Sequence, residues 1–409
     1  MQHQYESDLL DLWHKAPSPA YAKPADRPEV GKANDRLYAM TRSLWQQQLA
    51  ACDLPAALRM LHSQQMDIGF TQDDLSQVKY FQCYDEQQPA GRLSILSASK
   101  DEGDRLVAEP AHFIGMYNPR RAERTAGAGR LAPPRGSQTI NAADPACFLC
   151  PDNVRWQQRG IQLYYDMQPI NQRSYVALCN PFPFAPLHTT IALAAHEPQS
   201  WRMGTPGTGD KIRLIVEDLY DLAAALPMFV GFYNGVGAGA TIEKHLHYHF
   251  FECPKSQQLF PLQLAAQRAE LARGAGARTQ AVLDFGIADD FYPLGAFRLR
   301  GARKEVVEHA IALVAAWDEL LGDEATANVI VVTENQQVTM YVVPRNRTFS
   351  HSPGMAGIVG GLEALGEFVF CTPAEYQAIS EQKVTFDYMR RILQAVRPPH
   401  GLDMLQKST

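Results

Sequence analysis

The stretch His245-Leu246-His247-Tyr248-His249-Phe250-Phe251 alternates imidazoles with apolar side chains. On a β-strand, residues i, i+2 and i+4 point to one face of the sheet, so this spacing predicts a strand with its three histidines on one face and its apolar residues on the other. On a helix the histidines would diverge. Burying three imidazoles on one face is costly unless they have partners, so the face indicates a metal site or a site of phosphate chemistry rather than simple core packing.

The stretch just before it, Asn234-Gly235-Val236-Gly237-Ala238-Gly239-Ala240, consists almost entirely of small residues. Such a loop allows backbone N–H groups to approach phosphate oxygens closely, because no bulky side chain blocks them. We therefore expect Gly235 and Gly239 to bind phosphate, and Asn234 to contact the phosphate or the leaving group.

Hydrophobic periodicity around this region predicts alternating helices and strands. Helical spacing is found at 43–49, 54–65, 210–226, 263–273, 303–321 and 384–396. Short or alternating apolar runs, typical of strands, are found at 79–83, 92–97, 112–117, 162–165, 175–178, 189–194, 228–233, 327–333 and 338–343. The second half of the chain repeats the helix-and-strand pattern of the first half but has no second histidine triplet. We therefore expect any duplication to be structural, with the catalytic residues in one half only.

Composition excludes several classes of function. The chain of 409 residues is 46% hydrophobic, which is enough for a large core. A formal charge of −6 and a pI near 6.1, with no block of basic residues, argue against a nucleic-acid partner. No apolar run reaches the roughly 18 residues of a membrane span, and residues 1–6 do not resemble a signal peptide, so we expect no membrane partner and a cytoplasmic protein.

Five of the seven cysteines stand singly in apolar surroundings, which is typical of reduced core thiols, and only Cys147 and Cys150 form a pair. Their C-x-x-C spacing suits a tetrahedral zinc site that needs two further ligands, and His196 and His245 are the candidates. In that arrangement His247 stays available for chemistry. A metal bound by all three strand histidines and a redox-active cysteine pair are the alternatives, and the latter lacks a thioredoxin-like context.

His247, the central histidine, is a competent nucleophile in its neutral form, which is well populated at neutral pH. If a backbone carbonyl holds its Nδ1–H, Nε2 is directed outward and made more basic. It can then attack an α-phosphate to give a nucleotidyl-histidine.

Two of these motifs resemble a known superfamily. Cys147–Cys150, followed by Asn153-Val154-Arg155, resembles the zinc-binding segment of galactose-1-phosphate uridylyltransferases. Asn234-Gly235, the small-residue loop and His245-Leu246-His247 are similar to the Asn-x-Gly…His-x-His segment of the histidine-triad (HIT) and GalT-like nucleotidyltransferases, including the interval of 11 residues between Asn234 and His245.

Further segments resemble diadenosine tetraphosphate phosphorylases. Asn180-Pro181-Phe182-Pro183-Phe184 and the segment from Pro186 to Gln199 are similar to a strand pair of those enzymes, and Val343-Pro344-Arg345-Asn346-Arg347 to a Pro-Arg segment of their second half. The resemblance spans roughly residues 115–375.

The resemblance implies an α+β fold with duplicated HIT-like (GalT-like) antiparallel sheets, packed helices and an N-terminal helical extension. We expect residues 1–110 to form the extension, 111–260 the catalytic half, and 261–409 the second half. It also implies that His247 is the nucleophile, that His249 and Asn234 contact the reacting phosphate, and that a structural zinc is held by Cys147, Cys150, His196 and His245. Spacing leaves His188 open as a ligand in place of His196.

Two departures from the uridylyltransferase pattern bear on the second substrate. Uridylyltransferases carry Gln where this chain has His249 and Pro where it has Leu246, and the His-Leu-His-Tyr-His motif resembles more closely those of GDP-hexose phosphorylases and HIT hydrolases. We therefore expect cleavage of a nucleotide sugar or dinucleoside polyphosphate, with transfer of the nucleotide to phosphate or a phosphorylated acceptor such as a sugar phosphate. A HIT-type hydrolase and a non-catalytic, zinc-stabilised nucleotide-binding module are the alternatives, and a homodimer stays open.

Several side chains are candidates for holding the substrate. Guanidinium and ammonium groups suit phosphate, and Lys255 and Arg345 are the favoured cations, ahead of Arg120, Arg121 and Lys244. Asn180 and Phe182 are candidates for contacts with the substrate or its phosphates. Phe182 and Phe184 are candidates for stacking on a base, and core packing is at least an equal alternative for each.

Overall fold

The structure is a computed structural model. It describes residues 46–67, 75, 78–85, 111–122, 147, 149–151, 164–203, 207–253, 259–272, 285–287, 291–334, 337–399 and 405. The strand expected at 92–97 and the candidate Lys255 lie outside these residues.

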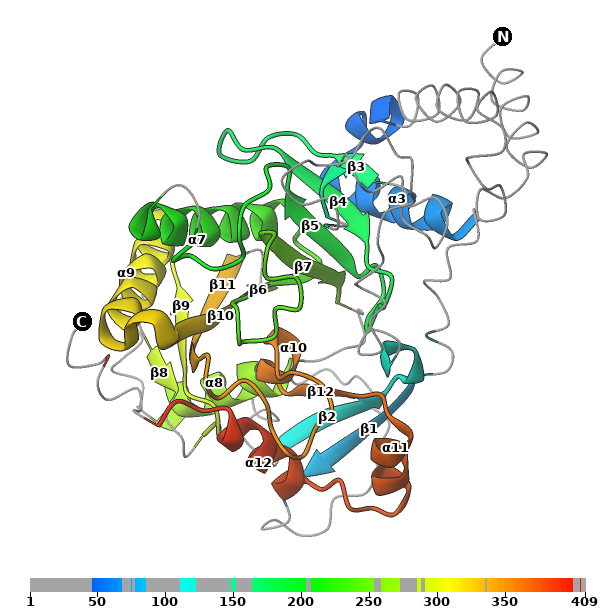
Figure 1. Cartoon of the computed structure of the whole chain (residues 1–409), viewed down its shortest axis with the longest axis vertical. Coiled ribbons are helices and arrows are strands. Elements are labelled where there is room, and N and C mark those ends of the chain that lie inside the picture. The colour runs from blue at the N-terminus through cyan, green and yellow to red at the C-terminus, as the bar shows by residue number, and fades with distance from the viewer. Residues whose placement is uncertain are drawn as a thin grey trace.

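The centre of the molecule is one large sheet, in which every pair of neighbouring strands is antiparallel (Figure 1). Among the described residues its strands are, in spatial order, β3 (Tyr164–Asp166), β4 (Tyr175–Cys179), β5 (Thr189–Leu193), β7 (His247–Glu252), β6 (Phe229–Asn234), β10 (Ala325–Glu334), β11 (Gln337–Asn346), β9 (Ala296–Arg300) and β8 (Phe285–Ile287).

The sheet contains the same arrangement twice. In the first copy the order is β4-β5-β7-β6, with helix α7 (Thr208–Ala225) between β5 and β6 along the chain. In the second copy the order is β8-β9-β11-β10, with helix α9 (Arg303–Leu321) between β9 and β10. The copies meet where β6 pairs with β10. This repetition confirms the α+β class with duplicated antiparallel sheets.

One face of the sheet packs against α7 and α9, and near β3 and β4 against α3 (Leu54–Asp67), as Figure 1 shows. Leu246, Tyr248 and Phe250 belong to the core on this side. Because side chains alternate along a strand, His247 and His249 point to the opposite face.

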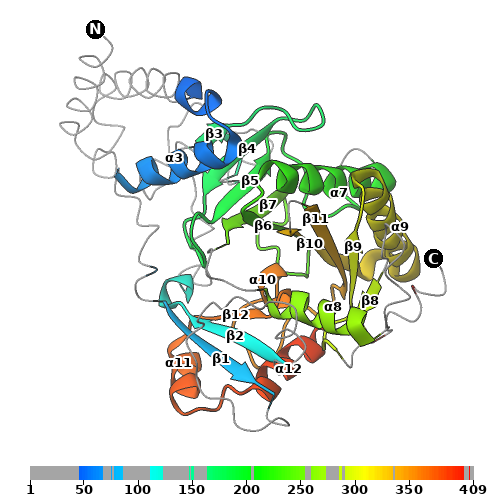
Figure 2. The same ribbon diagram turned by 180° about the vertical axis from the view of Figure 1, so that it is seen from behind.

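That opposite face is covered by α8 (Pro261–Ala272), α10 (Gly361–Ala364), α12 (Phe386–Ala395) and a small sheet, most clearly seen in Figure 2. In the small sheet β2 (His112–Tyr117) lies between β1 (Lys79–Tyr84), to which it is antiparallel, and β12 (Glu367–Phe370), to which it is parallel. Helix α11 (Pro373–Ser380) follows β12, and short 3-10 turns lie at Pro119–Arg121 and Gly322–Glu324. The small sheet contains one strand from each of the three segments expected from the sequence, namely β1 from 1–110, β2 from 111–260 and β12 from 261–409.

The long periodic segments fold as predicted, since α7, α8, α9 and α12 and the strands β4, β5, β6, β10 and β11 lie within a few residues of their expected bounds. β8, β9 and β12 were not expected. Among the described residues no helix combines the length and apolarity needed to cross a membrane.

Candidate metal centre and active site

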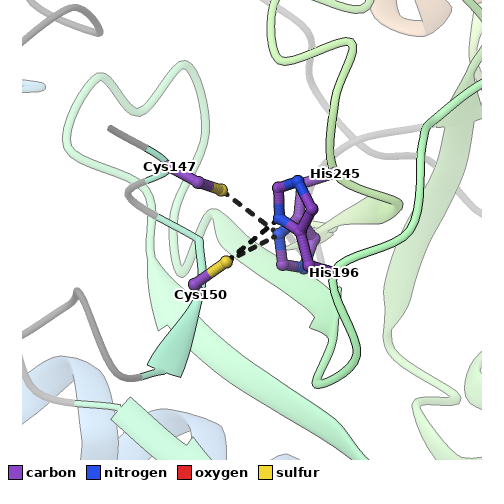
Figure 3. Close-up of side chains that lie close together, drawn as sticks. All are labelled: Cys147, Cys150, His196 and His245. Atoms are coloured by element: carbon purple, nitrogen blue, oxygen red, sulfur yellow. Dashed lines mark hydrogen bonds between the residues drawn. The ribbon is translucent and has the colours of Figure 1, made fainter. Parts of the chain in front are cut away.

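Two cysteines and two histidines meet at one end of the first half. The ligand atoms of Cys147, Cys150, His196 and His245 all lie within 4.8 Å of one another (Figure 3). Nδ1 of His245 is 3.2 Å from the sulfur of Cys147, and Nδ1 of His196 is 3.1 Å from the sulfur of Cys150. The three segments that carry these residues are far apart in the sequence, so only the tertiary fold brings them together.

The donor set fits a tetrahedral metal ion. Zn–S and Zn–N bonds of usual length place neighbouring sulfur and nitrogen ligands about 3.6 Å apart, close to the distances here. Nε2–H of His245 donates to the carbonyl of Leu193 at 2.7 Å, and this tautomer turns the Nδ1 lone pair toward the cysteines. The hydrogen bond with Cys150, reinforced by His245, lowers the pKa of the Cys147 thiol to about 3, against the effect of burial, and thereby favours the thiolate that binds metals.

The three histidines of the triplet do not lie in equivalent positions. Strand β7 begins at His247, and His245 precedes it, with its ring turned to the cysteines. His247 and His249 share the expected face, with ring centroids 5.1 Å apart. The expectation of one strand face for all three therefore holds for two of them.

The ring of His247 has the hydrogen bond to a backbone carbonyl that is the expected condition for nucleophilic attack by Nε2. Its Nδ1–H donates to the carbonyl of His245 at 2.7 Å, which leaves the lone pair of the ring on Nε2. Its backbone N–H donates to the side-chain oxygen of Gln199 at 2.8 Å. The side chain is buried, so contacts on both the ring and the backbone fix its direction.

His249 lies in a row of rings. Its Nδ1 shares a hydrogen bond of 3.0 Å with Nε2 of His188. The ring of His188 packs against Phe184 at 3.9 Å between centroids, and the guanidinium of Arg121 lies 5.0 Å from the centre of the Phe184 ring. The structure thus places His188 beside His249, and His196, the other candidate, in the cysteine cluster.

The side chain of Asn234 ties the glycine loop to the second half. Its Oδ1 accepts from Nδ2 of Asn328 and from the backbone N–H of Gly361, both at 2.9 Å. A Cβ on Gly235 would lie 2.2 Å from the hydroxyl of Thr326. Packing alone therefore requires a glycine at that position.

Gly239 is equally constrained, since it has a φ of +104° and a Cβ there would lie 2.4 Å from the Cα of Gly360. The sequence predicted that the backbone of this loop would approach another group closely. In the structure, the close contacts of the loop backbone are with the second half of the chain. Contacts of the loop with a phosphate stay a prediction.

Arg345 is completely buried on β11, where its Nη1 donates to Oδ1 of Asn328 at 2.9 Å and to the carbonyl of Val359 at 3.1 Å. Burial lowers its pKa to about 10, so it keeps its charge at neutral pH. Through Asn328 it is connected to Asn234.

The remaining candidates lie in the connection between β4 and β5. Nδ2 of Asn180 donates to the hydroxyl of Thr190 at 3.2 Å, and its Oδ1 accepts from the backbone of Phe182 at 2.9 Å. The carbonyl of Phe182 accepts from Arg121 at 2.6 Å. Asn180 thus lies beside Thr190, which pairs with His249 across the strands.

Two residues of this region had no assigned role from the sequence, Gln199 and Asn328. Each has a fully buried amide that joins separate segments of backbone or side chain. A buried amide that joins segments differs from that of any other glutamine or asparagine only in the distant residues that it contacts. No local sequence pattern could therefore have identified Gln199 or Asn328.

Residues 105–252 match the domain of unknown function DUF4922, which spans less than half of the chain. No curated protein matches the sequence. Among solved structures, the yeast Ap4A phosphorylase Apa2 in complex with AMP is 14% identical in sequence. The match covers 71% of this chain and 86% of the phosphorylase chain, with a TM-score of 0.44.

An ADP-glucose phosphorylase from Arabidopsis thaliana with bound ADP-glucose is also 14% identical, covering 73% of this chain and 99% of its own, with a TM-score of 0.32. A GalT-like protein from the same plant is 15% identical, covering 63% and 94%, with a TM-score of 0.32. Similarity at this level concerns the fold alone, so the function has to come from the site.

Proposed function

We propose that the protein is a nucleotidyltransferase of the phosphorylase type. It cleaves a nucleotide sugar or a dinucleoside polyphosphate through a covalent nucleotidyl-His247, and passes the nucleotide to phosphate or a phosphorylated acceptor. The observation that carries the proposal is the hydrogen bond of 2.7 Å from Nδ1–H of His247 to the carbonyl of His245, which directs the nucleophilic lone pair to Nε2.

The chemistry takes two balanced steps. Nε2 of His247 attacks the α-phosphorus, an N–P bond forms, and the bond from phosphorus to the bridging oxygen breaks, so that the leaving group departs with the electron pair. An oxygen of the acceptor phosphate then attacks the same phosphorus, the N–P bond breaks, and neutral His247 is restored. In the intermediate the imidazole carries positive charge, which the carbonyl of His245 stabilises through Nδ1–H.

The other candidate residues have supporting roles in this proposal. Asn234 and His249 contact the reacting phosphate, and the backbone at Gly235 and Gly239 faces its oxygens. Lys255 and Arg345 supply positive charge, and Asn180 and Phe182 contact the substrate. The direct contacts of Arg345 with Asn328 and Val359 mean that its charge acts from beneath the glycine loop.

We also propose that the metal is zinc and that its role is structural. A zinc ion bound by Cys147, Cys150, His196 and His245 would link the cysteine segment, the end of β5 and the start of β7. His245 precedes His247 by two residues and supplies the carbonyl for its Nδ1–H. The zinc would therefore hold the backbone that orients the nucleophile.

A panel of nucleotide sugars and dinucleoside polyphosphates, assayed with and without phosphate, tests the proposed reaction. We expect phosphate to accelerate turnover and to appear in a nucleoside diphosphate product, because it is the acceptor of the second step. Product analysis by ion-exchange chromatography with ³²P-labelled phosphate checks this. Turnover to a nucleoside monophosphate without any effect of phosphate would instead identify a HIT-type hydrolase.

Replacing His188 by phenylalanine keeps a ring beside Phe184 but removes the hydrogen bond to His249. If this hydrogen bond aligns His249 with the phosphate in the transition state, losing about 1.4 kcal/mol of that interaction slows transfer to His247 by roughly tenfold, which is the effect we expect. Single-turnover labelling measures this rate.

The same substitution in a His249→Gln background is the control. If His188 acts through His249, its replacement has little further effect there. Equal slowing in both backgrounds would contradict that role.

A further inference from the structure

In the central sheet, the side chain of Gln199 lies where the next pair of facing residues in the ladder between β6 and β7 would otherwise form. The ladder between β6 and β7 runs from Phe229 opposite Glu252 to Phe232 opposite His249. Continued by two residues, this register would place Asn234 opposite His247. There the amide of Gln199 bonds to both strands. Its Nε2 donates to the carbonyls of Asn234 at 2.8 Å and of His247 at 3.0 Å, and its Oε1 accepts from the N–H of His247 at 2.8 Å.

The amide thus acts as a peptide group inserted between two strands. It satisfies both backbone groups of His247 and separates the strands where the glycine loop begins. Gln199 is fully buried, so removing the amide would take a hydrogen-bond partner from each of these groups in a place shielded from water.

Gln199 is itself held firmly. Its backbone N–H donates to the carbonyl of Glu243 at 2.9 Å, and its carbonyl accepts from the hydroxyl of Tyr233. Two residues further along, the indole N–H of Trp201 donates to Asp318 on α9 at 2.7 Å. Arg202 donates to the same carboxylate at 2.8 Å. The second half of the chain therefore anchors the segment that carries Gln199.

We propose that Gln199 is a positioning residue for the nucleophile, an inference that rests on the proposed function. By fixing the backbone N–H and carbonyl of His247, it holds the ring where Nδ1–H reaches the carbonyl of His245. The ring and backbone contacts together define the direction of Nε2. Loss of the amide lets the strand shift, and a misplacement of about 1 Å at a reacting group can cost on the order of 100-fold in rate.

Two substitutions separate positioning from packing. Gln199→Leu removes every hydrogen bond of the amide. Gln199→Glu keeps its shape and its acceptor for the N–H of His247, but sets a carboxylate oxygen against two carbonyls. If hydrogen bonding positions His247, both variants lose rate; if Gln199 only fills space, Gln199→Leu, which keeps most of the side-chain volume, retains it.

Gln263→Leu is the matched control for lost stability. Gln263 is also a buried glutamine bonded to the backbone, since its Oε1 accepts from the N–H of Phe260 at 2.9 Å at the start of α8. Helix α8, which carries it, packs against β8 and β2. We expect it to lower the thermal midpoint much as Gln199→Leu does, and to leave the rate unchanged.

The measurement is the single-turnover rate of nucleotide transfer to the protein at saturating substrate, with the Kd for AMP determined by calorimetry. We expect both Gln199 variants to transfer about 100-fold more slowly, with the Kd for AMP within threefold of the unsubstituted protein. A rate equal to that of the unsubstituted protein would overturn the proposal. So would a parallel loss of rate and affinity, because it would indicate general collapse of the site.

A second measurement keeps this inference separate from the proposed function. In protein with ¹⁵N-labelled histidines, the imidazole nitrogens of His247 report its tautomer, and a His247→Asn sample assigns them. We expect the Nδ1–H form in the unsubstituted protein and a mixture of tautomers in Gln199→Leu. If no substrate labels the protein, the proposed function fails while this spectrum still tests the positioning. An unchanged tautomer in Gln199→Leu would refute it.

Discussion

We expect replacement of His247 by alanine to abolish covalent labelling by radioactive nucleotide and to lower turnover by on the order of 10⁶-fold, the scale of losing an essential nucleophile. The physical reason is that the reaction has no other route of comparable ease. The Nδ1–H bond to the carbonyl of His245 prepares one nitrogen for attack. His249 has its Nδ1 engaged with His188. Alanine removes the attacking atom and leaves the backbone contacts with Gln199 in place.

Acid-quenched filtration after mixing with α-³²P-labelled nucleotide measures the adduct, and initial rates over both substrates show whether the kinetics are ping-pong. His309→Ala is a matched control, because His309 lies exposed on α9 with its Nδ1–H donating to the carbonyl of Glu305. It should label as the unsubstituted protein does. Label retained in His247→Ala, or ternary-complex kinetics without any adduct, would contradict a nucleotidyl-His247. Tight nucleotide binding without turnover in either protein would identify a non-catalytic module.

We expect replacement of Cys150 by serine to remove the proposed zinc and most of the stability of the first half. A structural zinc contributes on the order of 10 kcal/mol to the folded state, comparable to the whole stability of a typical domain. The sulfur of Cys150 lies 3.1 Å from Nδ1 of His196 and 3.5 Å from Nδ1 of His245, so its loss leaves the cluster with three ligands. We expect about one equivalent of zinc in the unsubstituted protein and much less in the variant.

Inductively coupled plasma mass spectrometry gives the metal content, and denaturant titration with and without a chelator gives the free energy of unfolding. Cys52→Ser is the control, since this half-buried thiol lies outside the cluster and donates only to the carbonyl of Gln48 among the bonds described. It should keep its metal. A purified protein that is stable without metal, or a Cys150→Ser protein that binds zinc as tightly as before, would show that the site is not a structural zinc centre.

Local periodicity was enough to predict the parts of the fold that repeat along the chain. Alternation in 245–251 indicated a strand with a histidine face, and Leu246, Tyr248 and Phe250 indeed pack on the other side. The spacing of apolar residues in 210–226 and 303–321 predicted α7 and α9, and the similar style of the two halves predicted their duplication. These features follow from the geometry of a single helix or strand, which a short window of sequence contains in full.

Tertiary structure alone decided which polar groups meet. It turned His245 out of the strand toward the cysteines, placed His196 rather than His188 beside them, and put His188 against His249. It also paired β12 with β2 in the small sheet. Such contacts join residues far apart in the chain and depend on how layers pack, so no local period encodes them.

The histidine triplet shows both sides of this division. Its sequence determined the strand, the shared face of His247 and His249, and the kind of chemistry that imidazoles on one face support. The fold decided that His247 is held at its ring by His245 and at its backbone by Gln199, 48 residues away in the chain. The reason is physical: a side chain's direction follows from its own backbone, while its partners follow from the packing of the whole molecule.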